Sequence, residues 1–151
     1  MVAPNKLYAV INPPIIKLLR SPLHGFMSKN TMVLEFTGRK SGRTLVTPVS
    51  YFVESGRIHA FTGKGTTWWK NVAVKPDVEL TIKGRRLARK ATVVVDDAQA
   101  IANAMDRFLR AVPRDAKYSN VKLLPGGVPD PDDLRRVAPG MVHVHFPVGD
   151  L

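Results

Sequence analysis

Short stretches in which apolar and polar residues alternate recur along this chain, and they predict six strands. Glycine-containing turns at residues 54–57 and 83–85 join two pairs of these strands into hairpins. Pro48 lies inside the second strand and predicts an edge position or a bulge, because proline lacks the amide hydrogen that a central strand donates. The predicted strands span residues 32–37, 44–53, 58–62, 78–82, 86–95 and 141–146.

Three other segments have the spacing of amphipathic helices. Residues 14–28 begin with a proline and predict a short helix, which Pro22 should break or kink. Thr67 is the expected N-cap of a second short helix that ends at about residue 74. Asp96 or Asp97 should cap a third helix, whose apolar face carries Ile101, Met105, Phe108 and Leu109.

The order of these elements predicts the fold class. Strands that follow one another in hairpins favour an α+β fold with a small barrel or a strongly curved sheet over a doubly wound sheet. Residues 113–140 are rich in proline and glycine and predict a long loop or lid. Two parts are expected, an N-terminal helical segment over 1–30 and a barrel domain over 31–151. The polar side of residues 14–29 is cationic, so this segment either packs on the core or lies on a membrane surface.

The net charge is +11 at pH 7, and it is distributed unevenly. Residues 1–95 contain 16 basic and four acidic residues, whereas residues 96–151 contain seven basic and eight acidic ones. A domain this basic suits nucleic acid, an anionic membrane or a polyanionic small molecule. Residues 83–90 are the candidate contact for nucleic acid. Because aromatic residues make up only 7% of the chain and no stacking ladder accompanies this cluster, nucleic acid is not expected as a partner.

Composition also limits the chemistry of the chain. It contains no cysteine, which excludes disulfides, thiolate catalysis and cysteine-ligated metals. No Gly-x-Ser-x-Gly elbow and no strand-borne pair of carboxylates is present. His143 and His145 share one face of the last strand, but two histidines without a third ligand are typical of structural or surface positions, so no metal is expected. The sequence has no apolar run that could span a bilayer and no signal-peptide pattern, which favours a cytoplasmic protein.

Two short motifs carry more specific chemistry. The first, residues 37–43 (TGRKSGR), joins two predicted strands and combines small flexible residues with three cations and two hydroxyl groups, which suits phosphate or carboxylate. The second, residues 68–71 (WWKN), opens the predicted short helix. Adjacent helical residues point about 100° apart, so one tryptophan can enter the core while the other lines a cleft. A solvated basic turn and two core tryptophans are the structural alternatives.

Together with Thr47-Pro48, Gly63-Lys64 and Lys75-Pro76, these motifs resemble the deazaflavin-dependent nitroreductase family of actinobacteria, over about residues 30–95. The resemblance implies a split β-barrel that binds coenzyme F420, a deazaflavin with a phosphate and an oligoglutamate tail. It implies that the anionic part is held by Arg39, Lys40, Ser41, Gly42 and Arg43. It also implies that the deazaflavin and its ribityl chain are lined by Pro48, Gly63, Lys64, Trp68 and Asn71.

The activity implied by the resemblance is hydride transfer from reduced F420 to a hydrophobic, electrophilic acceptor, which needs no protein nucleophile. Tyr118 or solvent would deliver the accompanying proton, and residues 113–140 would form the wall on the acceptor side. The alternative is a non-catalytic binder of F420, FMN, haem or a fatty acid on the same barrel, FMN being less expected than F420. Either a monomer or a homodimer is expected.

Overall fold

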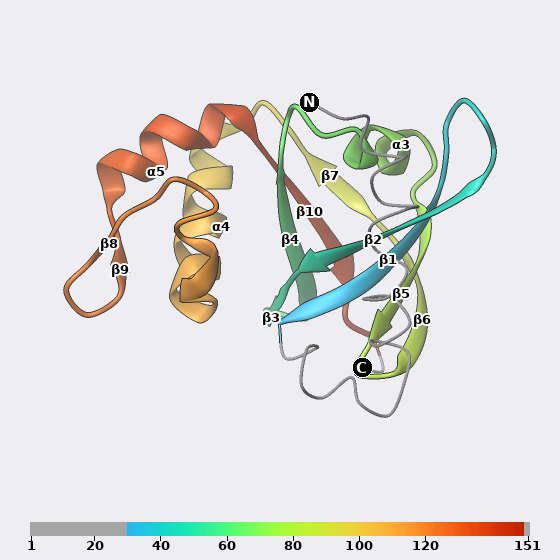
Figure 1. Cartoon of the computed structure of the whole chain (residues 1–151), viewed down its shortest axis with the longest axis horizontal. Coiled ribbons are helices and arrows are strands. Elements are labelled where there is room, and N and C mark those ends of the chain that lie inside the picture. The colour runs from blue at the N-terminus through green and yellow to red at the C-terminus, as the bar shows by residue number, and fades with distance from the viewer. Residues whose placement is uncertain (1–29, 150–151) are drawn as a thin grey trace.

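A computed structural model of the chain describes residues 30–149 (Figure 1). The helix predicted over 14–28 and the membrane contact predicted for 14–29 lie outside the described residues. Within these residues, no helix has both the length and the apolar composition that crossing a bilayer requires. The described chain contains two four-stranded sheets, a small two-stranded sheet and three α-helices.

Both large sheets are antiparallel. The loop of residues 38–43 closes the β1–β2 hairpin at one end of the first sheet, where Thr37 lies opposite Thr44. The first sheet contains, in spatial order, β2 (Thr44–Ser50), β1 (Thr31–Thr37), β5 (Asp77–Ile82) and β6 (Arg85–Lys90). The second contains β3 (Phe52–Glu54), β4 (Arg57–Gly63), β10 (Met141–Pro147) and β7 (Thr92–Val94).

The two longest predicted strands are each divided in the structure. The strand predicted over 44–53 breaks at Tyr51, and the strand predicted over 86–95 breaks at Ala91. In both cases the first half belongs to the first sheet and the second half to the second sheet. The chain therefore passes twice from one sheet to the other, and these crossings join the sheets into a barrel. Both predicted hairpin turns are confirmed, with left-handed residues at the two central positions of each turn.

The first two described helices follow their predicted positions. Helix α3 (Trp68–Val74) begins after Thr67, although the Thr67 side chain makes no capping hydrogen bond. Helix α4 (Ala98–Ala111) is capped by Asp97, whose carboxylate accepts a hydrogen bond from the Ala100 amide at 3.2 Å. Asp97, rather than Asp96, is therefore the cap.

The prediction of a long loop over 113–140 is wrong, because this segment folds into a compact layer. Asp130 caps helix α5 by accepting from the Asp132 amide, and Pro131 occupies the first turn, where a missing amide hydrogen costs nothing. Buried Leu134 attaches the layer to α4. The elements of the segment are two 3₁₀ turns (Pro113–Asp115 and Ala138–Gly140), β8 (Leu123–Leu124), β9 (Val128–Pro129) and α5 (Pro131–Val137).

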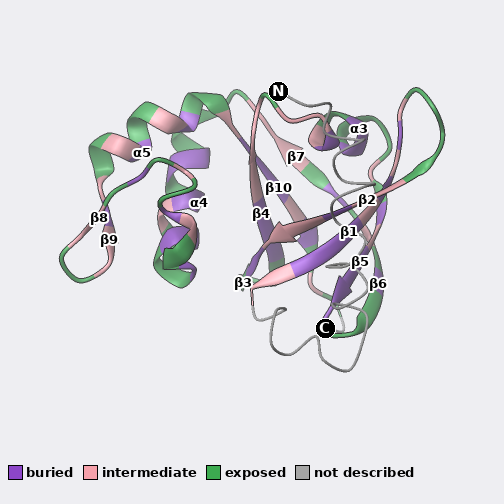
Figure 2. Cartoon of the chain, viewed as in Figure 1, coloured by how far each residue is buried: buried purple, intermediate pink, exposed green. Residues whose placement is uncertain are grey.

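Two apolar cores lie on opposite faces of the second sheet (Figure 2). Alternate residues of β4 and β10, such as Ile58 and Val144, fill the barrel interior. The other face carries Phe61 and Met141, which pack against the apolar stripe predicted for α4. The outer layer of α4 and α5 therefore covers one wall of the barrel, and its border with the barrel is where a site can form.

Candidate functional site

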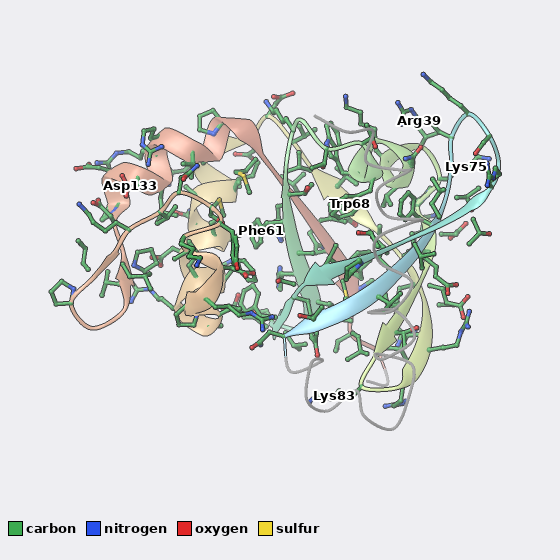
Figure 3. The ribbon with its side chains drawn as sticks, viewed as in Figure 1. Arg39, Phe61, Trp68, Lys75, Lys83 and Asp133 are labelled. Carbon is green, nitrogen blue, oxygen red and sulfur yellow. The ribbon has the colours of Figure 1, made fainter. Side chains whose placement is uncertain are left out.

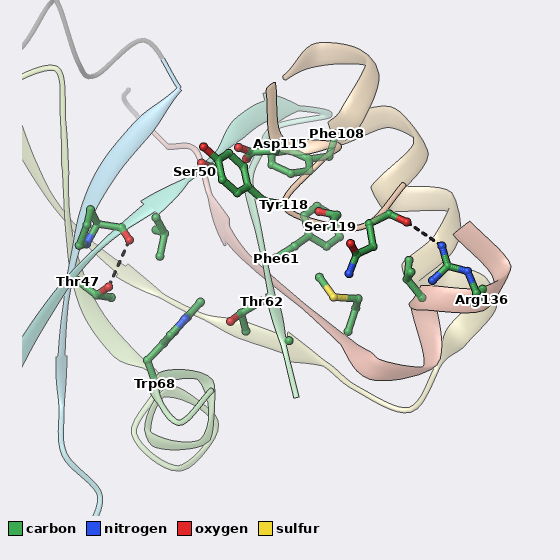
Figure 4. A pocket seen from close by; sticks show the side chains of 16 residues that line it. Thr47, Ser50, Phe61, Thr62, Trp68, Phe108, Asp115, Tyr118, Ser119 and Arg136 are labelled. Carbon is green, nitrogen blue, oxygen red and sulfur yellow. Dashed lines mark hydrogen bonds between the residues drawn. The ribbon is translucent and has the colours of Figure 1, made fainter. Parts of the chain in front are cut away.

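A pocket of about 710 Å³ lies between the barrel and the outer layer. Figure 4 shows side chains from the two parts facing each other across it. The barrel contributes Thr47, Pro48, Ser50, Thr62, Gly63 and Trp68, and the outer layer contributes Phe108, Asp115, Tyr118, Ser119 and Arg136. The pocket therefore joins residues from most of the length of the chain, which sequence spacing alone could not reveal.

Trp68 forms part of the barrel wall of this pocket. Its side chain is 2% exposed and belongs to the barrel core, yet it also faces the pocket (Figure 4). Trp69 has another environment, because its indole nitrogen donates to the Lys64 carbonyl at 3.3 Å. The two tryptophans thus occupy different sites, and three residues predicted to line the cofactor, Pro48, Gly63 and Trp68, meet in one pocket.

Stacked rings support the apolar side of the pocket. Phe61 packs against Phe108 at 5.0 Å and stacks on His143 at 4.7 Å between ring centroids. His59 Nε2 lies 3.1 Å from the Glu54 carbonyl, which only accepts, so this nitrogen carries hydrogen. With the His59 ring neutral, its Nδ1 accepts from His143 Nε2 at 2.9 Å.

The histidines support the pocket wall and do not act as groups that take up protons near neutral pH. Burial, and then the positive charge that His59 would carry, lowers the pKa of His143 to about 3. Burial is also the main reason that the pKa values of His59 and His145 are lowered. Among residues 30–149, no group of three or more histidine or carboxylate side chains is arranged to hold a metal ion.

The outer wall carries the polar groups of the pocket. Tyr118 is 75% exposed and lies near Ser50 and Asp115 (Figure 4). Arg136 donates to the Asn120 carbonyl at 2.8 Å and pairs with Asp133 at 3.2 Å. The hydrogen bond from the Lys122 amide, followed by that from Arg136, lowers the pKa of Asp133. Asp115 and Arg136 were not among the predicted site residues.

A second pocket, of about 240 Å³, lies at the basic loop and is lined by Gly38, Arg39, Lys40, Ser41, Thr67 and Asn71. Asn71 is 2% exposed and fixes this loop. Its Oδ1 accepts from the Arg39 amide at 2.9 Å and from the Arg39 guanidinium at 3.1 Å, while its Nδ2 donates to the Thr67 carbonyl at 3.1 Å. The amide of Asn71 thus shapes the small pocket and does not line the large one.

Three predicted residues lie outside both pockets. Gly42 has φ of 71° and closes the tight turn, where its amide donates to the Gly38 carbonyl at 2.9 Å. Arg43 is exposed beside it. Lys64 pairs with Asp96 at 2.5 Å. Their roles toward a cofactor stay predictions.

Two elements connect the small pocket to the large one. At the start of α3, Thr67 lines the small pocket and Trp68 lines the large one. Strand β2 leaves the basic loop at Thr44 and reaches the large pocket at Pro48. Four residues of strand span about 13 Å. A ligand that fills both pockets is therefore elongated, with an anionic part at the loop and another part between barrel and outer layer.

Solved structures share this fold. A protein of unknown function from Agrobacterium tumefaciens has a TM-score of 0.56 at 16% identity; the match covers 89% of this chain, which spans only 53% of that protein. An F420-H2-dependent reductase, FDR-A, has a TM-score of 0.50 at 19% identity, covering 78% and 94% of the two chains. An FMN-binding, pyridoxamine 5′-phosphate oxidase-related protein from Nostoc punctiforme has a TM-score of 0.56 at 16% identity, covering 91% and 81%. These likenesses confirm the predicted split β-barrel.

No curated protein matches the chain. The model of one protein family does match, over residues 21–121, and this range includes the basic loop, both tryptophans and the whole of α3. It confirms the resemblance to F420-dependent reductases that the two motifs indicate. The chain belongs to the F420H(2)-dependent quinone reductase family.

Proposed function

We propose that this protein is an F420H2-dependent reductase of a hydrophobic, electrophilic acceptor. The observation that carries the proposal is the pair of pockets that β2 and the start of α3 both reach, one basic and small, the other larger and partly apolar. Their separation along β2 suits a cofactor with an anionic end and a flat ring system. The family to which the chain belongs supports F420 as that cofactor.

The donors of the small pocket fit a phosphate group. The Arg39 guanidinium is oriented by Asn71, and Lys40 and the Ser41 hydroxyl lie beside it. Guanidinium and ammonium groups make charge-assisted hydrogen bonds to phosphate oxygens. We assign Arg39, Lys40 and Ser41 to the phosphate, with Gly42 closing the turn that carries them. Arg43 is exposed in the same loop, outside the small pocket, and would add long-range attraction.

The ring system would then lie in the large pocket against Pro48, Gly63 and Trp68. When bound, reduced F420 supplies a hydride from its ring. Phe61 and Phe108 provide apolar surface for the acceptor and exclude water from that side. A quinone or a nitroaromatic compound has the required neutral, flat and electrophilic character.

The proton that accompanies the hydride comes from Tyr118 or from solvent. Tyr118 is the tyrosine of the outer wall, and its exposure places the hydroxyl where it can exchange protons with water. Lys64 reaches a cofactor only after leaving Asp96, so we assign it a secondary role.

The test is titration of the purified protein with oxidised F420 and with FMN, followed by reoxidation of reduced F420 with menadione and with a nitroimidazole. F420 binding with accelerated reoxidation supports the proposal, and preference for FMN contradicts it. F420 binding without acceleration by either acceptor indicates a non-catalytic binder. A Tyr118→Phe variant with an unchanged rate and pH profile assigns the proton to solvent.

A further inference from the structure

The outer wall of the large pocket contains one charge of each sign. Among the described residues that line this pocket, Arg136 is the only basic side chain and Asp115 is the only acidic one. The Asp115 carboxylate lies 3.9 Å from Arg114. An acceptor that is already negatively charged would meet this carboxylate, whereas a neutral acceptor meets no net charge on the wall. The two charges together favour a neutral molecule.

The Arg136 guanidinium is held through one of its three nitrogens. Nη2 donates to the Asn120 carbonyl at 2.8 Å and lies 3.2 Å from the Asp133 carboxylate. Within residues 30–149, Nε and Nη1 make no hydrogen bond. The side chain is 58% exposed, so these two nitrogens are not enclosed by protein. A guanidinium fixed at one nitrogen keeps its other N–H groups for a ligand, in a direction that the fixed contact sets.

Asn120 supplies a second donor to the same wall. Its backbone is left-handed, with φ of 58°, a conformation that asparagine adopts more readily than most residues. In the part of the chain that the structure describes, its side-chain amide makes no hydrogen bond, and it lines the pocket. The bond from Arg136 to its carbonyl joins two separate elements across this wall (Figure 4). The two residues therefore position each other and both keep donors for a ligand.

Two threonine hydroxyls on the barrel wall have already donated their protons. Thr47 donates to the Pro48 carbonyl at 3.2 Å (Figure 4). The Thr66 hydroxyl donates to the Gly63 carbonyl at 3.0 Å, so the bond of 2.7 Å between Thr62 and Thr66 takes its proton from Thr62. Toward a ligand, Thr47 and Thr62 can therefore only accept. The charged donor of the pocket lies on the opposite wall.

This donor pair is far from the basic loop. Figure 3 shows Phe61 between Trp68 of the barrel and Asp133, the partner of Arg136, while Arg39 lies on the opposite side of the molecule from Asp133. The donors therefore lie beyond the aromatic rings, away from the pocket assigned to the phosphate. Their position suits the acceptor and not the anionic part of the cofactor.

We infer that Arg136 and Asn120 donate hydrogen bonds to an oxygen of the acceptor, and that the Arg136 charge stabilises this oxygen as it becomes negative. The inference rests on the proposed function and narrows the acceptor to neutral, flat molecules whose ring system carries a carbonyl or nitro oxygen. The acceptor takes a hydride with its electron pair and is reduced, and a proton from Tyr118 or solvent neutralises the oxygen. One proton passes to solvent as the cofactor becomes oxidised. Because the neutral acceptor lacks the negative charge, the guanidinium stabilises the transition state more than the bound substrate.

The first test requires no turnover. A polyfluorinated phenol, which is flat and ionises near neutral pH, is bound to the protein saturated with oxidised F420, and fluorine NMR follows its ionisation. The phenolate oxygen resembles the oxygen of the half-reduced acceptor. The wild-type protein should raise the ionisation constant of the bound phenol by about tenfold relative to Arg136→Gln, the lower end of the effect of a neighbouring guanidinium on an acid. Glutamine keeps a donor for the Asn120 carbonyl, and Arg136→Lys, which keeps the charge, should restore much of the effect.

The second test is reduction of menadione by reduced F420. Arg136→Gln should lower kcat by about tenfold with a smaller change in KM, since the charge arises only in the transition state. This loss is smaller than the roughly 100- to 1000-fold effect of an enclosed oxyanion donor, because Arg136 is partly exposed. Asn120→Gly keeps the left-handed backbone and removes a bond that the neutral acceptor already makes, so it should mainly raise KM.

The matched control is Arg135→Gln, which removes the same charge from the same helix. Arg135 is exposed, pairs with Asp132 and does not line the large pocket. Equal ionisation of the phenol in the wild type and in Arg136→Gln would overturn the inference, and so would an equal effect of the control. The two proposals fail in different ways. Absence of F420 binding contradicts the proposed function, whereas F420 binding with unchanged menadione kinetics in Arg136→Gln contradicts only the inference about Arg136.

Discussion

Replacement of Asn71 by alanine tests whether the small pocket depends on one buried amide. The substitution removes three hydrogen bonds, two that Oδ1 accepts from Arg39 and one that Nδ2 donates to the Thr67 carbonyl. The Thr67 carbonyl keeps a second partner, because it also accepts from the Lys70 amide at 3.1 Å. Losing the hydrogen bond from Asn71 therefore costs this carbonyl little. The Arg39 amide loses its partner, which costs about 1–3 kcal/mol for a group shielded from water. The remaining two bonds add about 1 kcal/mol, so we expect Asn71→Ala to lower the free energy of unfolding by about 3 kcal/mol.

The measurement is urea unfolding of Asn71→Ala beside Asn71→Asp. Aspartate keeps an acceptor for both Arg39 groups, but its second oxygen replaces the donor and faces the Thr67 carbonyl, so this variant should also lose stability, by at least about 1 kcal/mol. The aspartate would place a negative charge in the small pocket. Binding of an anionic cofactor should therefore weaken by more than the loss of folding stability alone would cause. A loss below about 1 kcal/mol for the alanine variant would refute the proposed role of this amide.

Three further predictions concern other parts of the site. The pKa of His143 in the folded protein is about 3, well below its ordinary value, because the ring is buried in its neutral form. The stability that depends on this neutral ring is complete above the ordinary pKa and is lost as pH falls toward the folded pKa. Between about pH 7 and about pH 4.5, His143→Gln should lose about 2–3 kcal/mol less stability than the wild type, measured by urea unfolding at each pH. Equal losses would contradict the burial argument. Asp96→Asn frees Lys64 from its ion pair, so F420 affinity measured by fluorescence should rise if Lys64 contacts the cofactor and stay constant if it does not. Cofactor binding should quench fluorescence strongly in Trp69→Phe, where Trp68 alone emits, and weakly in Trp68→Phe.

The local sequence patterns predicted most of the strands but not where two of them break. Residues 44–53 and 86–95 each suggest one continuous strand. Pro48 predicts an edge or a bulge, but nothing in the alternation marks Tyr51 or Ala91 as the point where the strand breaks. Both residues are buried, and each lies where the chain leaves one sheet for the other. The breaks follow from closing the barrel, which is a property of the whole fold rather than of either segment.

The outer layer had a local signal that proline and glycine content obscured. Asp130-Pro131 followed by two aspartates, with Arg135 and Arg136 in the last turn, has the features of a helix start and end. That pattern would have predicted α5. It would not have predicted that Arg136 lines the large pocket, since this depends on how α5 packs on α4 and how Asp133 orients the guanidinium.

The charges of the molecule are best understood by which of them are already paired. Sequence counts separate a basic first part of the chain from a nearly neutral second part. They do not distinguish Arg86, between two glutamates, from Lys75, which pairs with no carboxylate among residues 30–149. Among the described residues, Lys40 and Arg43 of the basic loop pair with no carboxylate beside the pocket shaped by Asn71, while Arg136 of the acceptor wall is paired with Asp133. Such a division suits a cofactor held mainly by its anionic end, leaving the larger pocket to accommodate acceptors of differing shape. We therefore expect substitutions in the basic loop of residues 38–43 to change cofactor affinity, and substitutions on the outer wall to change acceptor preference.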